Sequence, residues 1–351
     1  MNPIKIQPPI NNDPPLFCHH CGHDIPRSEA FVDDGIVLCH DCYYGHYHRC
    51  TECGRLVHEA HRYYIDDEVC CFYCYNKHWE EERSLHEYSY KPEPIFYGDG
   101  RRFLGVELEI DDAGRSEDNA ESILNVANRS AKHMYIKCDS SLDDGMELVT
   151  HPMTLDYHLN HAPWQDIMDT CLDMGYASHN TDTCGLHVHV NRESFGQSVS
   201  EQEDVIGRIL FFVERFWSEL LQFSRRTSYQ LQRWAARYGR KGSPKDILDH
   251  AKSDSPGRYT CVNLQNRNTI EFRIFRGTLK YNTLAATLQL VDEICNVAAL
   301  LSDEEMLRLN WSDFVERLDS NRHSELLGYL SLRGLADCNE REGLSCAVCS
   351  E

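Results

Sequence analysis

Cysteine is the residue type whose spacing in this sequence points most directly to chemistry. The chain has 351 residues and 17 cysteines, and Cys-x-x-Cys pairs recur four times before residue 80. Two thiolates at this spacing can bind one tetrahedral zinc ion together. An odd number of cysteines in a reducing compartment indicates metal ligands and free thiols rather than a disulfide framework. The pairs are Cys18/Cys21, Cys39/Cys42, Cys50/Cys53 and Cys71/Cys74.

An internal repeat assigns these pairs to two zinc fingers, each with its own four thiolates. The repeat aligns Leu38 with Cys70, so we expect Cys71 to be the ligand and Cys70 to occupy a buried apolar position. Units this short have too little core to fold without metal. Interleaved pairing across the fingers and unligated thiols are the alternatives. A shift of 32 residues places Cys18, Cys21, Gly22, Cys39, Cys42, Tyr43 and His46 on Cys50, Cys53, Gly54, Cys71, Cys74, Tyr75 and His78.

The tandem arrangement resembles LIM-type and treble-clef fingers, but seven residues rather than two separate Cys42 from Cys50. The formal net charge of the chain is −21. Acidic residues also outnumber basic ones within the fingers, and zinc bound by thiolates adds further negative charge. The fingers are therefore poor partners for nucleic acid, and we expect a structural role or a protein partner.

A second set of candidate residues lies on strand-like segments that alternate between apolar and polar side chains. In residues 102–110, Val106, Leu108 and Ile110 share one face, and the acidic residues between them share the other. Residues 145–149, 184–190 and 268–275 repeat this pattern. An antiparallel sheet with one solvated face alternates in the same way, which is the plain alternative. The polar faces carry Glu107, Glu109, Glu147, His187, His189, Glu271 and Arg273.

These polar residues differ from those of an ordinary solvated face. Carboxylates gathered on one surface repel one another unless cations lie between them. Oxygen ligands with an imidazole suit magnesium or manganese, and an arginine beside them suits phosphate. The amphipathic stretches 204–223, 283–301 and 312–330 are expected to be helices that pack on the apolar side of the sheet.

Four motifs in order resemble the amidoligases, carboxylate–amine ligases related to glutamine synthetase and glutamate–cysteine ligase. The resemblance covers about residues 98–301. It implies an α+β fold in which a curved antiparallel sheet has helices on its convex face. It also implies ATP and two or more magnesium ions on the concave face. The motifs are Phe-Leu-Gly-Val-Glu-Leu-Glu from Phe103, Lys-Cys-Asp-Ser-Ser from Lys137 with Gly-Met-Glu-Leu-Val-Thr from Gly145, Cys-Gly-Leu-His-Val-His-Val from Cys184, and Thr-Ile-Glu-Phe-Arg-Ile-Phe-Arg-Gly-Thr from Thr269.

The resemblance also implies roles for individual residues. It favours His189 over His187 as the histidine that binds metal or nucleotide, and leaves His187 as a catalytic candidate. Arg273 resembles the residue that contacts the transferred phosphate, and Asp139 resembles an acidic residue that faces the amine or the acceptor. The residues implied to bind magnesium and nucleotide are Glu107, Glu109, Glu147, His189 and Glu271.

Two features bear on how ATP would bind. No Gly-x-x-x-x-Gly-Lys-Ser/Thr loop occurs in the sequence, and the nearest approach, Gly239–Lys245, has the wrong spacing. ATP would therefore bind on the sheet. The polar segment 225–256, with Arg225, Arg226, Arg233 and Arg237, is a candidate lid or substrate-recognition insert, with a solvated pair of helices as the alternative.

We expect a soluble, cytoplasmic protein, because the N-terminus lacks the features of a signal peptide and no apolar run reaches the roughly 18 residues of a membrane span. The predicted function is ATP-dependent amide formation, with the fingers recruiting a partner or substrate. A non-enzymatic adaptor and a metal-dependent hydrolase are the alternatives. The predicted parts are a disordered segment 1–16, a finger module 17–80, a linker 81–97, a catalytic domain 98–335 and a tail 336–351. A short helix is expected over 80–91, at the junction of the finger module and the linker. The tail contains Cys338, Cys346 and Cys349.

Overall fold

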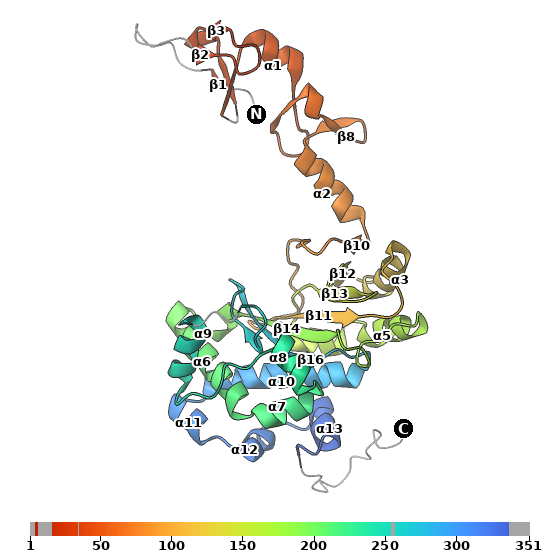
Figure 1. The fold of residues 1–351 in the computed structure, drawn as a ribbon, viewed down its shortest axis with the longest axis vertical. Coiled ribbons are helices and arrows are strands. Elements are labelled where there is room, and N and C mark those ends of the chain that lie inside the picture. The colour runs from red at the N-terminus through yellow and green to blue at the C-terminus, as the bar shows by residue number, and fades with distance from the viewer. Residues whose placement is uncertain (1–3, 6–15, 34, 254–256, 337–351) are drawn as a thin grey trace. The chain divides into compact units, whose positions relative to one another are not determined.

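The computed structural model describes residues 4–5, 16–33, 35–253 and 257–336. The chain forms two compact units, drawn in Figure 1. We call Met1–Arg83 the cysteine-rich unit and Ser84–Glu351 the sheet unit. Residues 84–97, expected to be linker, thus belong to the sheet unit. The tail cysteines Cys338, Cys346 and Cys349 lie outside the described residues, as do most of residues 1–16.

The cysteine-rich unit repeats one series of elements twice, each time around a small apolar core. Each series is two strands, a 3-10 turn, two more strands and a helix, which matches the repeat seen in the sequence. The short strand β1 (Ile4–Lys5) pairs with β4, although it falls in the segment expected to be disordered. The first series is β2 (Leu16–Phe17), β3 (Asp24–Ile25), η1 (Arg27–Glu29), β4 (Phe31–Asp33), β5 (Ile36–Leu38) and α1 (His40–His46). The second is β6 (Tyr47–Arg49), β7 (Leu56–His58), η2 (Glu59–His61), β8 (Tyr63–Ile65), β9 (Glu68–Cys70) and α2 (Phe72–Glu82).

The sheet unit is built on a seven-stranded sheet in the order β10-β12-β13-β11-β14-β16-β15. Every neighbouring pair is antiparallel except β10 and β12, which are parallel. The sheet is therefore mixed, and the prediction of a purely antiparallel sheet was wrong. The extra edge strand comes from residues expected to be helix and linker. The strands are β10 (Leu85–His86), β11 (Leu104–Ile110), β12 (Met134–Lys137), β13 (Met146–Thr150), β14 (Gly185–Asn191), β15 (Val262–Asn263) and β16 (Thr269–Arg276).

One face of this sheet is apolar and packs into the main core. Val106, Val188 and Phe272 alternate inward from three adjacent strands, and none is more than 1% exposed. Helix α10 runs beneath the strands in Figure 1 and contacts α6 and α13. The helices are α3 (Glu117–Ala127), α4 (Leu155–Asn160), α5 (Trp164–Asp173), α6 (Val199–Arg215), α7 (Trp217–Ser224), α8 (Ser228–Trp234), α9 (Pro244–Ser253), α10 (Tyr281–Leu300), α11 (Asp303–Arg308), α12 (Trp311–Glu316) and α13 (Ser324–Leu332).

The expected helices are present with changed limits. The stretch 204–223 forms two helices, α6 and α7, which meet at Phe216. The stretch 312–330 likewise forms parts of α12 and α13. By length and composition α10 could cross a membrane, but 72% of its most apolar window is buried inside the unit. That burial is typical of a core helix in a globular domain.

Candidate functional site

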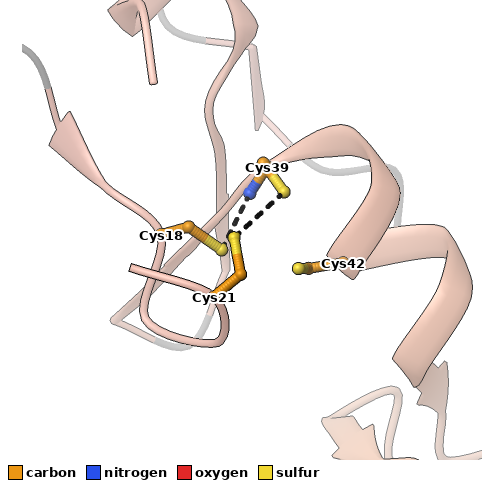
Figure 2. Close-up of side chains that lie close together, drawn as sticks. All are labelled: Cys18, Cys21, Cys39 and Cys42. Carbon is orange, nitrogen blue, oxygen red and sulfur yellow. Dashed lines mark hydrogen bonds between the residues drawn. The ribbon is translucent and has the colours of Figure 1, made fainter. Parts of the chain in front are cut away.

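The first cysteine tetrad lies where the β2–β3 turn meets the start of α1. Figure 2 shows Cys18, Cys21, Cys39 and Cys42 facing one another, and their four sulfur atoms all lie within 4.8 Å of one another. The Sγ atoms of Cys21 and Cys39 are 3.9 Å apart. Burial opposes ionisation of Cys18, but backbone N–H donors from Cys21 and Cys39 outweigh it and lower the thiol pKa to about 6. Burial raises the pKa of Cys42 in the same tetrad, and the neighbouring thiols add to that shift, so the four thiols do not ionise alike in the absence of metal.

The second tetrad, Cys50, Cys53, Cys71 and Cys74, has the same spacing. The Sγ atoms of Cys53 and Cys71 are 3.8 Å apart. Cys70 is fully buried and lies outside the tetrad, the arrangement expected from the repeat. Both tetrads draw all four sulfurs from one repeat, so the structure does not pair the cysteines across the fingers. Four sulfurs at this spacing fit a structural zinc ion.

Each tetrad depends on a glycine in its first turn. Gly22 and Gly54 have φ of 75° and 72°, in the left-handed region that glycine favours. The N–H of Gly22 donates to the carbonyl of Cys18, and Gly54 donates likewise to Cys50. These turns bring the two thiols of the Cys-x-x-Cys pair to the same side of the chain.

The polar face of the large sheet carries the second candidate site. In the strand register Glu109 lies opposite Glu147, Glu107 opposite His187, and His189 opposite Glu271. The side chains of Glu109, Glu147, His187 and Glu271 are no more than 4% exposed, so this is not a solvated face. The alternation in the sequence thus identified side chains that the fold does bring together.

Two groups on this face have the spacing of metal ligands. One is Glu107, His187 and Glu271, and the other is Glu109, Glu147 and His187; within each, one ligand atom per residue lies within 4.8 Å of the others. His187 belongs to both groups. His189, which the resemblance favoured, belongs to neither group. Its Nε2 lies 3.3 Å from Glu107 Oε1, and His187 Nδ1 lies 3.4 Å from Glu107 Oε2, so both histidines face this carboxylate.

Cationic side chains accompany both groups. Arg273 forms an ion pair with Glu271, while Lys137 Nζ lies 3.0 Å from Glu147 Oε2. Burial disfavours the charge of Lys137, but the carboxylates of Glu147 and Glu107 outweigh it and raise its pKa. Lys137 had no predicted role. It stands two residues after Tyr135 on the polar side of β12, opposite Glu147 in the register, so the alternation of that strand could have identified it.

The pKa values of two neighbouring carboxyl groups are shifted in opposite directions. Burial raises the pKa of Glu147 well above its ordinary value, and the charge of Glu107 adds to the shift. Burial acts the same way on Glu107, but His189 and His187 outweigh it and lower its pKa well below the ordinary value. Neighbouring groups whose pKa values are driven apart are a frequent feature of active sites.

Other predicted residues lie elsewhere. Asp139 stands in the turn between β12 and β13, where its carboxylate accepts the N–H of Ser141, and it belongs to neither ligand group. Within the predicted insert, Arg237 pairs with Glu214, and Arg233 lies over the Trp234 ring. Arg226, from the same predicted insert, lies beside Gly185 at the second ligand group.

A family of known proteins matches the part of the chain that carries this site. Residues 107–295, more than half of the chain, match the family model described as "Putative amidoligase enzyme". The chain belongs to the amidoligase family. The match begins at Glu107 and contains every acidic and histidine residue of the two ligand groups. The chain is thus a ligase by family, and the resemblance read from its motifs is confirmed.

Solved structures give more distant similarities to this amidoligase. A bifunctional glutathione synthetase from Pasteurella multocida matches with 14% identity and a TM-score of 0.34, over 67% of this chain and 45% of that one. The ligase PafA, in its complex with the prokaryotic ubiquitin-like protein Pup, matches with 10% identity and a TM-score of 0.35, over 67% of this chain and 62% of that one. The amidoligase thus spans less than two thirds of either chain. No curated protein sequence matches it.

Proposed function

We propose that this amidoligase joins a carboxylate to an amine at the expense of ATP, through an acyl phosphate. The observation that supports it best is the pair of ligand groups around His187, each accompanied by a cation, buried in the case of Lys137 and partly exposed in the case of Arg273. Phosphoryl transfer needs this combination of metal sites and fixed cations, because negative charge accumulates on the moving phosphoryl group.

The donors fit magnesium. Carboxylate oxygens predominate in both groups, and hard oxygen ligands suit this ion better than they suit zinc. Glu107 and Glu271 would hold one ion and Glu109 and Glu147 a second, with His187 between them. Bound magnesium would offset the charge of the ATP phosphates.

The proposed reaction has two steps. A carboxylate oxygen of the acid attacks the γ-phosphorus of ATP, the bond to the β-phosphate oxygen breaks, and ADP leaves. The amine nitrogen then attacks the acyl carbon, the C–O bond to phosphate breaks, and the nitrogen loses a proton. Arg273 neutralises charge on the phosphoryl group in the first step. Asp139 would contact the amine from the β12–β13 turn.

For the cysteine-rich unit we propose two structural zinc ions, one in each tetrad, and a docking role toward a protein partner or substrate. The all-sulfur donor sets and the small cores support structural metal. Exposed aromatic side chains on α2, among them Phe72 and Tyr73, support a protein partner.

The decisive experiment is a screen for ADP release by the full chain with magnesium. A ligase releases ADP when acid and amine are both present; a hydrolase needs no ATP, and an adaptor does neither. Arg273→Ala should lower the rate by roughly a hundredfold or more, because its charge acts as phosphate moves. Arg308→Ala, on an arginine whose side chain is 81% exposed on α11, is the matched control and should leave the rate unchanged. ADP release that ignores the amine would contradict the proposal.

A further inference from the structure

A buried arginine that forms no ion pair with any described residue lies beside the second ligand group, near Glu109. Arg226 is only 6% exposed. Burial lowers its pKa to about 10, and Glu109 opposes the shift, so the side chain stays charged at neutral pH. None of the ion pairs between described residues includes Arg226. Glu109 supports this charge without forming an ion pair with it, and Glu109 is itself a proposed magnesium ligand, so the buried guanidinium remains available to bind an anion.

The local structure holds Arg226 in place. Arg225 ends α7 in the left-handed conformation, with φ of 60°, and so turns the chain toward the sheet. The N–H of Arg226 then donates to Ser224 Oγ at 3.3 Å, and its Nη1 donates to the carbonyl of Arg273 at 3.2 Å. One end of the guanidinium is thereby anchored to β16.

The other end lies against Gly185, the first residue of β14. A Cβ on Gly185 would overlap Arg226 Nη2 and would also lie 2.8 Å from His187 Nε2 and 3.3 Å from Glu109 Oε2. Arg226 Nη2, His187 Nε2 and Glu109 Oε2 therefore surround one backbone position. The missing side chain of Gly185 is what lets the guanidinium reach this place.

The site thus has two halves with different cations. The half formed by Glu107 and Glu271 has Arg273, which already donates to Glu271. The half formed by Glu109 and Glu147 has Arg226, whose Nη2 end is not engaged by a carboxylate among the described residues. His187 joins the two halves.

We propose that Arg226 and the backbone position at Gly185 form the subsite for the acid substrate, where Arg226 binds the carboxylate and then the acyl phosphate made from it. The inference rests on the proposed function and adds the location of the acid within it. The nucleotide phosphates belong to the Arg273 half. A guanidinium suits the acid because its planar fork matches two oxygens of one carboxylate or phosphate.

Binding of a stable acyl-phosphate analogue separates this subsite from the nucleotide site. The probe is acetonylphosphonate, titrated calorimetrically into the full chain with magnesium and ADP. In Arg226→Ala its affinity should fall roughly tenfold or more, because a hydrogen bond to a charged group is lost. The affinity for ADP with magnesium should change by less than about twofold, since Arg273 is intact. Retained ADP binding also shows that the variant is folded.

A pair of glycine substitutions supplies the matched control. Gly185→Ala should reproduce the loss, because its Cβ would displace Arg226. Gly105→Ala, on the neighbouring strand β11, should bind the analogue like the parent, because its Cβ would meet His189 Cβ at an ordinary 3.6 Å.

Three results would overturn the inference: unchanged analogue affinity in Arg226→Ala, an equal loss of ADP affinity, or a parent that binds ADP but not the analogue. A parent that binds neither ligand would contradict the proposed function itself.

Discussion

The two candidate metal-binding regions of this chain are assembled in opposite ways. In the cysteine-rich unit each set of four ligands lies within a short stretch, Cys18 to Cys42 or Cys50 to Cys74. In the sheet unit one ligand group joins Glu107 to Glu271 across three adjacent strands. Ligands that are close in sequence can be assigned by spacing alone. Ligands that come from distant strands require the order and register of the sheet.

The regions also differ in what holds them together. The apolar clusters of the two fingers are small, and Leu56 of the second repeat belongs to the first cluster, whereas the sheet unit buries large side chains such as Trp164, Phe212 and Phe272 in one continuous core. The fingers should therefore need zinc in order to fold, and the sheet unit should fold without magnesium. Under the proposed function, metal would be structural in the first region and would serve chemistry in the second.

Removing zinc tests this difference with the largest expected effect. Structural zinc contributes on the order of 10 kcal/mol in small domains, so a chelator should unfold the fingers and leave the melting of the sheet unit in place. Cys71→Ser should reduce the zinc content from two ions per chain to one, because it removes a ligand of the second tetrad. Native mass spectrometry gives the zinc count, and calorimetry shows the two transitions.

Cys70→Ser is the matched control, since Cys70 is fully buried but lies outside the tetrad. It should keep two zinc ions and lose only modest stability. If Cys70→Ser loses an ion and Cys71→Ser does not, the repeat alignment is wrong.

Neutralising single carboxylates on the sheet has the next largest effect. Mutual repulsion among bare carboxylates would make such changes neutral or stabilising without metal, which the sequence alone suggested. The structure indicates otherwise for Glu271, which accepts from Arg273 and, at 2.8 Å, from Asn263 Nδ2. Glu271→Gln should therefore unfold more easily without magnesium, by about 3 kcal/mol, because it leaves a largely buried arginine unpaired.

Glu109→Gln is the comparison, because Glu109 accepts the N–H of Gly185 and has no ion pair among the described residues. Its charge also supports the buried Arg226, so Glu109→Gln should lose some stability but less than Glu271→Gln. Both variants should lose the stabilisation that magnesium and ATP give the parent. Melting curves with and without millimolar ligand measure both effects, and variants that respond like the parent would show that these carboxylates bind no metal.

Most residues of the candidate site could be predicted from the sequence, but the order of the strands could not. Alternation along each strand identified Glu107, Glu109, Glu147 and Glu271, because a strand places every second side chain on one face. It could not assign their neighbours, since strand order is a property of the whole sheet. Arg226 was singled out only as part of an insert, because its place beside Gly185 depends on the turn after α7.

The edge strand β10 was missed for a related reason. Two residues are too short to show alternation, and the charged residues before them favour a helix. Leu85–His86 becomes a strand because β12 offers it a free edge.

Truncation uses this strand to refine the boundary between the two regions. Removal of residues 1–83 should leave a sheet unit with the melting temperature of the full chain, because the units part at Arg83. Removal of residues 1–90 also deletes β10 and should lower stability by about 2 kcal/mol, through the loss of its hydrogen bonds and packing. Equal melting of the two truncated proteins would show that β10 contributes nothing to the sheet.

The smallest expected effect concerns the contribution of one core histidine to the pH dependence of the sheet unit. His158 is fully buried; Nε2 donates to the carbonyl of Leu104 at 3.0 Å, and Nδ1 accepts from Trp164 Nε1 at 3.3 Å. Protonation of the ring would add a proton to Nδ1, which would then face the N–H of Trp164.

Burial lowers the pKa of His158 to about 4. The stability that the neutral ring contributes is therefore full above pH 6.5, its ordinary pKa, and is lost as pH falls toward 4, by about 1 kcal/mol per pH unit. His158→Gln should be less stable at pH 7.5 but should lose less between pH 6.5 and 5, and His161→Gln, on an exposed ring of the same turn, should follow the parent. Urea unfolding of the 1–83 truncation at several pH values measures the slopes, and a parent whose stability is flat over this interval would contradict the assignment of a neutral, buried His158.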